Sequence, residues 1–275
     1  MKNNKPITQT TALRLRQGGA TASACARQML GGGLLRAVAP NLVRIAQFAV
    51  LVLLWKGFAA AGADLGGMSL PQLLTYTLMS FAFRQQMDII SPATSSMWEG
   101  SVIGRYTRPM PVYLSYISET VGRRWLPYWA FFALPALLVA PLLGISPLPA
   151  SAARLGLFAV SLLLSCVIGF GLDLLLAAFA MRLKNAMWAV NQIRDAIYNL
   201  LSGALIPFAL FPGWAQWLLG LLPFGSVASA PLSIYIGLGQ PWQLLGLQLF
   251  WAVAIWPLAH LAYKKGEEGM VSYGG

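Results

Sequence analysis

Long apolar stretches constrain this chain more than any other feature. About six of them follow one another, and each approaches the roughly 20 residues that a helix needs to cross the hydrocarbon core of a bilayer. Hydrophobic residues make up 57% of the 275 residues and charged residues only 10%, whereas soluble domains are about half apolar and about a quarter charged. A chain of this size cannot hide so much apolar surface from water, so we expect lipid to be its main solvent.

The stretches predict an all-α integral membrane protein with about six transmembrane helices in a single domain, 1–275. This domain divides into an N-terminal segment (1–37), a membrane domain (38–263) and a tail (264–275). Glycine, proline and serine punctuate the loops between the stretches. The predicted spans are residues 38–58, 70–90, 126–143, 155–181, 193–211 and 244–263.

The stretch 214–238 allows two interpretations. It carries no charge and is long enough to cross, but Pro223, Gly225 and Pro231 break it into short pieces. We favour short helices that enter from the outer face and return, since broken backbone at membrane depth is tolerated only where protein or water surrounds it. A full crossing would also move the basic tail after residue 263 to the outside.

The positive charge falls in alternate gaps between the stretches. With both termini in the cytoplasm, the inner segments hold all but three of the 19 Lys and Arg. Lys56 and Arg154 fall outside, and Arg44 is undecided. This asymmetry follows the positive-inside rule. It also explains the net charge of +11 by contact with the bilayer, so we expect no nucleic-acid partner. The first apolar stretch begins only near Val38, which is late for a cleavable signal peptide.

Few residues suit catalysis or metal binding. Cys25 and Cys166 form no disulfide framework, and His260 has no visible partner. The sequence contains no Walker A loop, no Gly-x-Ser-x-Gly elbow and no His-Glu-x-x-His motif. We therefore expect no catalytic residue, no metal and no cofactor bound by this chain. If it moves a substrate uphill, a second subunit must supply the energy.

The largest inner segment, 91–125, contains a short charged and aromatic stretch that Pro109 ends. Arginine and aromatic residues supply much of the energy at protein interfaces, so this stretch suits docking of a soluble partner. A solvated loop with ordinary inner-face charge explains the composition equally well. The candidate docking residues are Trp98, Glu99, Gly100, Arg105, Tyr106, Arg108 and Pro109.

Asp173 and Arg194 are two of the charges that lie inside predicted spans. Asp173 lies within the fourth apolar stretch, where a carboxylate should face protein or water rather than lipid. If the turn after this span lies near Lys184, Asp173 and Arg194 reach similar depths on adjacent helices. We predict that they are neighbours or share a small polar network, and we favour a structural role over a proton or substrate site. Two closer pairs, Glu119 with Arg123 and Arg84 with Asp88, have the four-residue spacing that pins helix ends.

A transport pathway needs small, polar or adaptable side chains on facing spans. The same residue types also serve ordinary helix packing. The candidates that could line a pathway on the second and fifth spans are Tyr76, Met79, Ser80, Phe83, Asn199 and Ser202.

With these residues noted, the chain resembles the permease subunits of ABC-2 type (type-2 ATP-binding-cassette) exporters over nearly its whole length. One mark is Trp98-Glu99-Gly100 leading to Arg108-Pro109. Others are the run Leu201-Ser202-Gly203-Ala204-Leu205-Ile206-Pro207, followed by Phe211-Pro212-Gly213-Trp214.

The resemblance implies an assembly of two permease chains, identical or homologous, with two ABC ATPase subunits that bind ATP and Mg²⁺. A coupling helix at 96–106 would rest on the ATPase, and an amphipathic interfacial helix would lie within 11–36, although five glycines there weaken it. Re-entrant outer helices would match 214–222 and 227–236. The pathway would run between the permeases, along their first, second and fifth spans, in a cell inner membrane.

Two other functions stay open at this point. One is a membrane-embedded enzyme acting on lipid substrates, although Asp64 and Asp88 stand apart from other acidic or histidine side chains. The other is a membrane assembly protein that transports nothing. Under the exporter hypothesis, the few charges in the spans favour an apolar or amphiphilic cargo.

Overall fold

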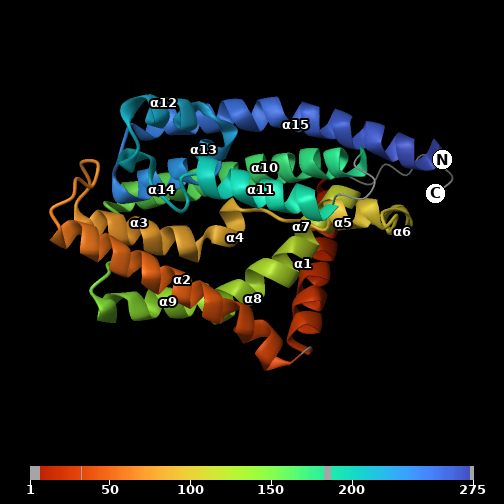
Figure 1. The fold of residues 1–275 in the computed structure, drawn as a ribbon. Coiled ribbons are helices and arrows are strands. Elements are labelled where there is room, and N and C mark those ends of the chain that lie inside the picture. The colour runs from red at the N-terminus through yellow and green to blue at the C-terminus, as the bar shows by residue number, and fades with distance from the viewer. Residues whose placement is uncertain (1–6, 32, 183–186, 273–275) are drawn as a thin grey trace.

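The computed structural model describes residues 7–31, 33–182 and 187–272 of the chain (Figure 1). This part is helical, without a β-strand. In chain order the elements are α1 (Ile7–Gly31), α2 (Leu34–Ala60), α3 (Leu70–Ala82), α4 (Arg84–Met87), α5 (Ala93–Trp98), α6 (Ile103–Tyr106), α7 (Val112–Thr120), η1 (Val121–Trp125), α8 (Leu126–Tyr128), η2 (Trp129–Ala133), α9 (Leu134–Val139), η3 (Ala140–Leu143), α10 (Ala152–Arg182), α11 (Met187–Leu201), η4 (Phe208–Leu210), α12 (Gly213–Leu221), α13 (Pro223–Val227), α14 (Ser229–Ile236) and α15 (Pro241–Ser272).

Four helical stretches of the described chain are long and apolar enough to cross a membrane: Val38–Ala60, Val112–Leu143, Ala152–Phe179 and Pro241–Gly266. They contain the first, third and sixth predicted spans and all but the last two residues of the fourth. The chain is therefore an all-α, multi-pass membrane protein. The third stretch begins at Val112 rather than near residue 126, because the helix continues below the predicted span. Its 32 residues correspond to about 48 Å, well beyond the roughly 30 Å of hydrocarbon.

The second and fifth predicted spans are not the long continuous helices that the sequence suggested. α3 has 13 residues, and a turn at Phe83 separates it from the four residues of α4. α11 has 15 residues and ends at Leu201 rather than Phe211. Gly203 follows with φ +74°, a left-handed conformation that stops the helix, and Pro207 lies just beyond.

Side chains of α3 satisfy the backbone groups that this break exposes. The Tyr76 hydroxyl donates to the Gly203 carbonyl at 2.7 Å, and the Ser80 hydroxyl donates to the Ala204 carbonyl at 2.5 Å. The Ser202 Oγ accepts from the Ala204 N–H at 3.1 Å. These bonds let non-helical backbone lie inside an apolar bundle, where unpaired polar groups are costly.

Proline shapes the third long helix. The π-helical segments η1 and η2 end shortly before Pro127 and Pro135, respectively. A proline ring clashes with the carbonyl four residues earlier, which here lies within each π-helical segment. A wider turn makes room for the ring without breaking the helix.

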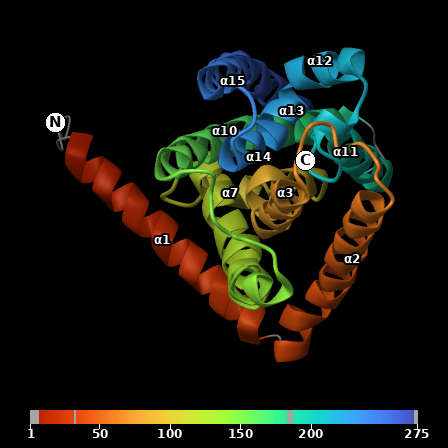
Figure 2. The same cartoon turned by 90° about the vertical axis from the view of Figure 1, so that its left-hand side faces the viewer.

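The helix α1 crosses one end of the bundle, roughly perpendicular to the long helices (Figures 1 and 2). It packs against α7 and η1. At this crossing Gly122 brings the two backbones together: a Cβ built there would lie 2.2 Å from the Ala22 carbonyl oxygen. The interfacial helix expected within 11–36 is thus one helix over 7–31, and the next helix starts at Leu34.

Three short helices, α12, α13 and α14, connect the fifth stretch to α15. None is long enough to cross a bilayer, in agreement with the re-entrant arrangement expected for 214–238. α12 lies at the end of the bundle opposite α1 (Figure 1). It exposes 72% of Trp214 and 69% of Trp217, as tryptophans at a membrane interface do.

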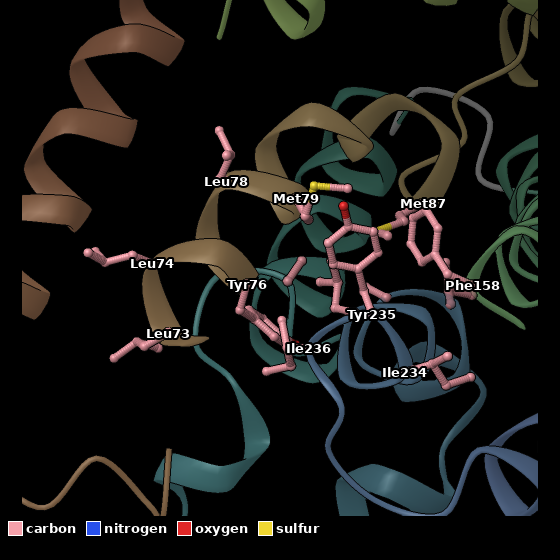
Figure 3. Close-up of a cluster of buried hydrophobic side chains, with 14 of the residues drawn as sticks. Leu73, Leu74, Tyr76, Leu78, Met79, Met87, Phe158, Ile234, Tyr235 and Ile236 are labelled. Carbon is pink, nitrogen blue, oxygen red and sulfur yellow. The ribbon is translucent and has the colours of Figure 1, made fainter. Parts of the chain in front are cut away.

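The largest buried cluster joins α3, α10 and α14 (Figure 3). The Phe158 ring of α10 meets the Tyr235 ring of α14 edge-on, with 4.9 Å between the ring centroids. Tyr76 and Met79 face this cluster, while α10 runs along α15 on the other side. This core fixes α3 and the break after α11 relative to the rest of the bundle.

Candidate functional site

The segment 96–109 forms a tip at the same end of the bundle as α1 (Figure 1). Gly100, two residues after the end of α5, has φ +71° and turns the chain, and α6 then presents Ile103 and Tyr106, which are 58% and 54% exposed. Glu99, Arg108 and Pro109 are exposed as well. Trp98 is the last residue of α5, and its side chain lies outside the described part of the structure. The exposed side chains of this tip can contact a partner without rearrangement of the bundle.

Arg105 differs from its neighbours because its side chain points into the protein. It is only 8% exposed, and its guanidinium pairs with the Glu119 carboxylate at 2.9 Å. It also donates to the Ser115 hydroxyl at 3.0 Å and lies over the Tyr116 ring, 4.7 Å from the centroid. The sequence alone suggested that Arg105 presents its charge to a docked protein. Because the side chain is buried, it cannot do so. It anchors the tip to α7.

A hydrogen-bonded network extends this anchor to two further helices. The Tyr116 hydroxyl lies 2.8 Å from the Ser96 hydroxyl and 2.9 Å from the Tyr263 hydroxyl of α15. The second Glu119 oxygen pairs with Arg123 at 3.1 Å, and Arg123 reaches Gln28 of α1 at 3.4 Å. The base of the tip is thus tied to the third long helix, to α15 and to α1.

The predicted intramembrane pair is connected through the linker 88–91, which joins α4 to α5. Asp173 of α10 accepts hydrogen bonds from the Ser91 N–H and hydroxyl. Arg194 of α11 donates to the Ile89 carbonyl at 3.3 Å and lies 3.6 Å from the Asp88 carboxylate.

Asp173 and Arg194 both line a cavity of about 40 Å³. No ion pair within 4.0 Å joins them in the described chain, where Arg194 instead pairs with Asp88 and Asp195. The turn expected near Lys184 lies outside the described residues. The two side chains hold the same linker from two helices.

A larger cavity of about 570 Å³ opens between α2, the α3–α4 region and α11. Of the six predicted pathway residues, Asn199 lines it. The Asn199 Oδ1 accepts a hydrogen bond from Arg84 at 2.7 Å. The lining residues are Val43, Arg44, Ala46, Gln47, Val50, Leu51, Phe81, Arg84, Asn199 and Leu205. We call this cavity the groove.

The other five predicted pathway residues do not line the groove. Tyr76, Ser80 and Ser202 are buried and serve the broken backbone after α11. Met79 is buried in the core, and Phe83 packs between the rings of Trp129 and Phe158. Tyr76, Met79 and Ser80 thus face the core and the segment after α11 rather than the groove. The packing of α3, rather than its composition, decides which of its sides is open.

The sequence interpretation missed the polar side of α2. Arg44 and Gln47 line the groove from an otherwise apolar helix. With Asn41 they recur every three residues, a spacing that places them on one helix face. This stripe was a readable signal, because polar residues in a span should face protein or water.

His260 is also paired, contrary to expectation. Its Nδ1 lies 3.0 Å from the Tyr113 hydroxyl on the exposed side of α15. The described residues hold no group of three histidine, cysteine or acidic side chains placed to bind a metal.

Comparison with known proteins bears on this arrangement of tip, groove and short outer helices. A search of curated proteins returned no match. A family model described as "ABC-2 family transporter protein" matches residues 45–274, from within α2 through all later helices. This range contains the tip and all the residues that line the groove except Val43 and Arg44. With most of its length matched, the chain belongs to the ABC-2 family and is a multi-pass permease component of an ABC transporter.

Proposed function

We propose that this chain is the permease subunit of an ABC exporter, which docks a separate ATPase on its tip and forms the substrate pathway with a second permease chain, identical or homologous. Two ATPase copies bind ATP and Mg²⁺ and carry out the hydrolysis. The complex lies in the cell inner membrane with the N- and C-termini of the permease in the cytoplasm. The charge asymmetry of the inner segments supports this orientation.

The observation that carries the proposal is an exposed tip on a buried anchor. Ile103, Tyr106 and Arg108 face outward, with the aromatic and arginine chemistry found at the centre of protein interfaces. Directly beneath them the Arg105–Glu119 pair fixes the tip to the third long helix. A partner that moves the tip must therefore also move the helices to which it is tied.

The groove supports the second half of the proposal. It is open on one side of the single chain and combines Arg44, Arg84 and Asn199 with apolar residues of α2. α2 also exposes large apolar side chains, with Val50 61% and Leu53 68% exposed. A second permease against this face would close the groove into a pathway.

The mechanism follows from the contacts that join the tip and the linker 88–91 to the long helices. ATP draws the two ATPase subunits together, and the docked tips move with them. The motion passes through Glu119 to the third long helix and through the linker 88–91 to Asp173 and Arg194 on α10 and α11. ATP binding shifts the pathway between two states only if those states contact the ATPase differently. The tip is the surface where we place that difference.

The test is a charge reversal at the tip. Arg108→Glu, combined with Tyr106→Ala, should weaken binding of the ATPase at least about tenfold and abolish the transport-linked ATP turnover of the purified complex. The control is Lys56→Glu, which reverses one exposed charge near the C-terminal end of α2, outside the tip. It should leave ATPase binding and ATP turnover unchanged. A tip variant that co-purifies with the ATPase and transports like the wild type would contradict the docking assignment. Turnover of lipid by the isolated permease would instead favour the enzyme hypothesis.

A further inference from the structure

An arginine-lined pocket lies where α1, α2 and the third long helix meet. Its volume is about 130 Å³. Arg44 comes from α2, while Arg123 and Arg124 come from η1. The remaining lining residues are Met29, Pro40, Asn41, Gln85, Pro127 and Tyr128. Three cations thus face a small space that no carboxylate lines.

Two of these arginines have only neutral close partners. Arg44 donates to the Asn41 Oδ1 at 2.7 Å and lies over the Tyr128 ring at 5.2 Å. The Arg124 Nε donates to the Gln85 Oε1 at 3.1 Å. Neither has a carboxylate within 4.0 Å in the described chain, whereas Arg123 is paired with Glu119.

The burial of these arginines makes the missing anion informative. The Arg44 and Arg124 side chains are half-buried. A guanidinium withdrawn from water without a counter-charge is costly, and in membrane proteins such a group usually faces a functional partner. Asp88 and Asp173 act on Arg124 only from beyond 4.0 Å, and both already have other partners: Asp88 pairs with Arg84 and Arg194, and Asp173 accepts from Ser91. The pocket itself therefore offers its arginines no carboxylate.

The position of the pocket indicates which anion this is. Arg124 lies two residues before the predicted start of the third span, and Arg44 six residues after that of the first. α1 crosses the bundle at the same end (Figure 2). Both positions lie near one end of their predicted spans, so their long side chains can reach the headgroup region that flanks the roughly 30 Å hydrocarbon core.

Chemistry narrows the ligand further. The guanidinium fork binds phosphate oxygens bidentately, and basic pockets between transmembrane helices bind anionic headgroups. Met29, Pro40 and Pro127 add an apolar border for the glycerol and the first acyl carbons.

We propose that this pocket binds the headgroup phosphate of one anionic phospholipid, held by Arg44 and Arg124 at the corner between α1 and α2. The bound lipid neutralises both arginines and links the interfacial helix to the first and third long helices. The proposal does not depend on the ATPase or on the transported substrate.

The test uses the full chain, purified in detergent and stripped of lipid. Dioctanoyl phosphatidylglycerol, dioctanoyl phosphatidylcholine and inorganic phosphate are titrated separately, with the shift in unfolding temperature as the readout. Native mass spectrometry counts the phosphatidylglycerol molecules retained by each chain. We expect saturable binding of one phosphatidylglycerol, at least about tenfold tighter than either phosphatidylcholine or phosphate.

Two variants and one control locate the binding. Arg44→Gln with Arg124→Gln should weaken phosphatidylglycerol binding at least about tenfold, since two charge-assisted contacts are lost. Arg44→Gln alone leaves the third long helix intact and should weaken binding several-fold, which keeps the test valid if the double variant does not fold. Arg27→Gln removes an exposed charge from α1 outside the pocket and should bind like the wild type.

Three outcomes would overturn the proposal. The first is wild-type affinity for phosphatidylglycerol in Arg44→Gln and in the double variant. The second is equal affinity for phosphatidylcholine, which would show that the net charge of the headgroup is not recognised. The third is inorganic phosphate binding as tightly as the lipid, which would assign the pocket to a soluble anion.

Discussion

At the scale of single residues, one carboxylate has two partners with different surroundings. Glu119 pairs with Arg105, whose side chain is 10% exposed, and with Arg123, whose side chain is 48% exposed. Removing one member of a buried pair leaves the other charge without compensation, whereas an exposed partner is readily solvated. The two partners of Glu119 should therefore contribute very unequally to stability.

We expect Glu119→Gln to destabilise the protein by about 3 kcal/mol, because Arg105 is left buried without its anion. Thermal unfolding in detergent should show a lower midpoint by at least about 6 °C. Arg123→Gln removes the half-exposed partner of the same carboxylate and should cost less than about 1 kcal/mol. Equal losses in the two variants would show that Arg105 is not held mainly by this pair.

At the scale of elements, the docking of α1 depends on a position that has no room for a side chain. A Cβ on Gly122 would lie 2.2 Å from the Ala22 carbonyl oxygen and 2.8 Å from the Cys25 Cβ. Both obstacles are close to the backbone of α1, so they cannot swing aside. Alanine is the better helix former by about 1 kcal/mol, so any loosening of α1 must come from the clash.

Gly122→Ala should therefore separate α1 from η1 and raise the rate of maleimide labelling at half-buried Cys25 several-fold, measured in a Cys166→Ser background. Gly19→Ala is the matched control, because a Cβ at Gly19 meets no atom within 4 Å. Labelling of Cys25 at the wild-type rate in Gly122→Ala would mean that α1 is held elsewhere.

The sequence predicted the elements unevenly, for physical reasons. Apolar length located the four long stretches and the charge pattern separated them, since both depend on composition alone. Composition could not reveal that the helix stops before Gly203, because the residues on both sides of the stop are mostly apolar or small. The continuation of the third long helix down to Val112 was also hidden, because Glu119, Arg123 and Arg124 are typical of a loop as well as of a helix beyond the membrane.

At the scale of the whole molecule, the groove and the exposed face of α2 predict where a second permease lies. We expect Val50→Cys to form a disulfide-linked product of about double mass under mild oxidation of membranes, in a background where both native cysteines are serine. Leu249→Cys on α15 is similarly exposed, at 56% against 61% for Val50, and should not cross-link. Preferential cross-linking through Leu249 would place the partner on the opposite side.

The candidate docking stretch is exposed in the structure, but the sequence did not show how its individual side chains are oriented. The stretch 96–109 is an exposed tip, but a sequence does not show that Arg105 turns inward while Arg108 faces solvent. Likewise Tyr76 and Ser80 have the chemistry of a pathway, yet their hydroxyls are used by backbone carbonyls more than 120 residues later. Such pairings depend on tertiary contacts that local spacing does not encode.

The two π-helical segments of the third long helix have a consequence for its angular phase. A π-turn holds about one residue more than an α-turn, and each residue advances a helix by about 100°. Glu119 below the first segment and Phe132 within the second therefore do not follow one regular 3.6-residue repeat. This offset lets one continuous helix direct a polar side toward the tip and an aromatic side toward α3. Losing a single residue between Val121 and Ala133 would turn one half against the other, so this stretch should tolerate substitutions far better than deletions.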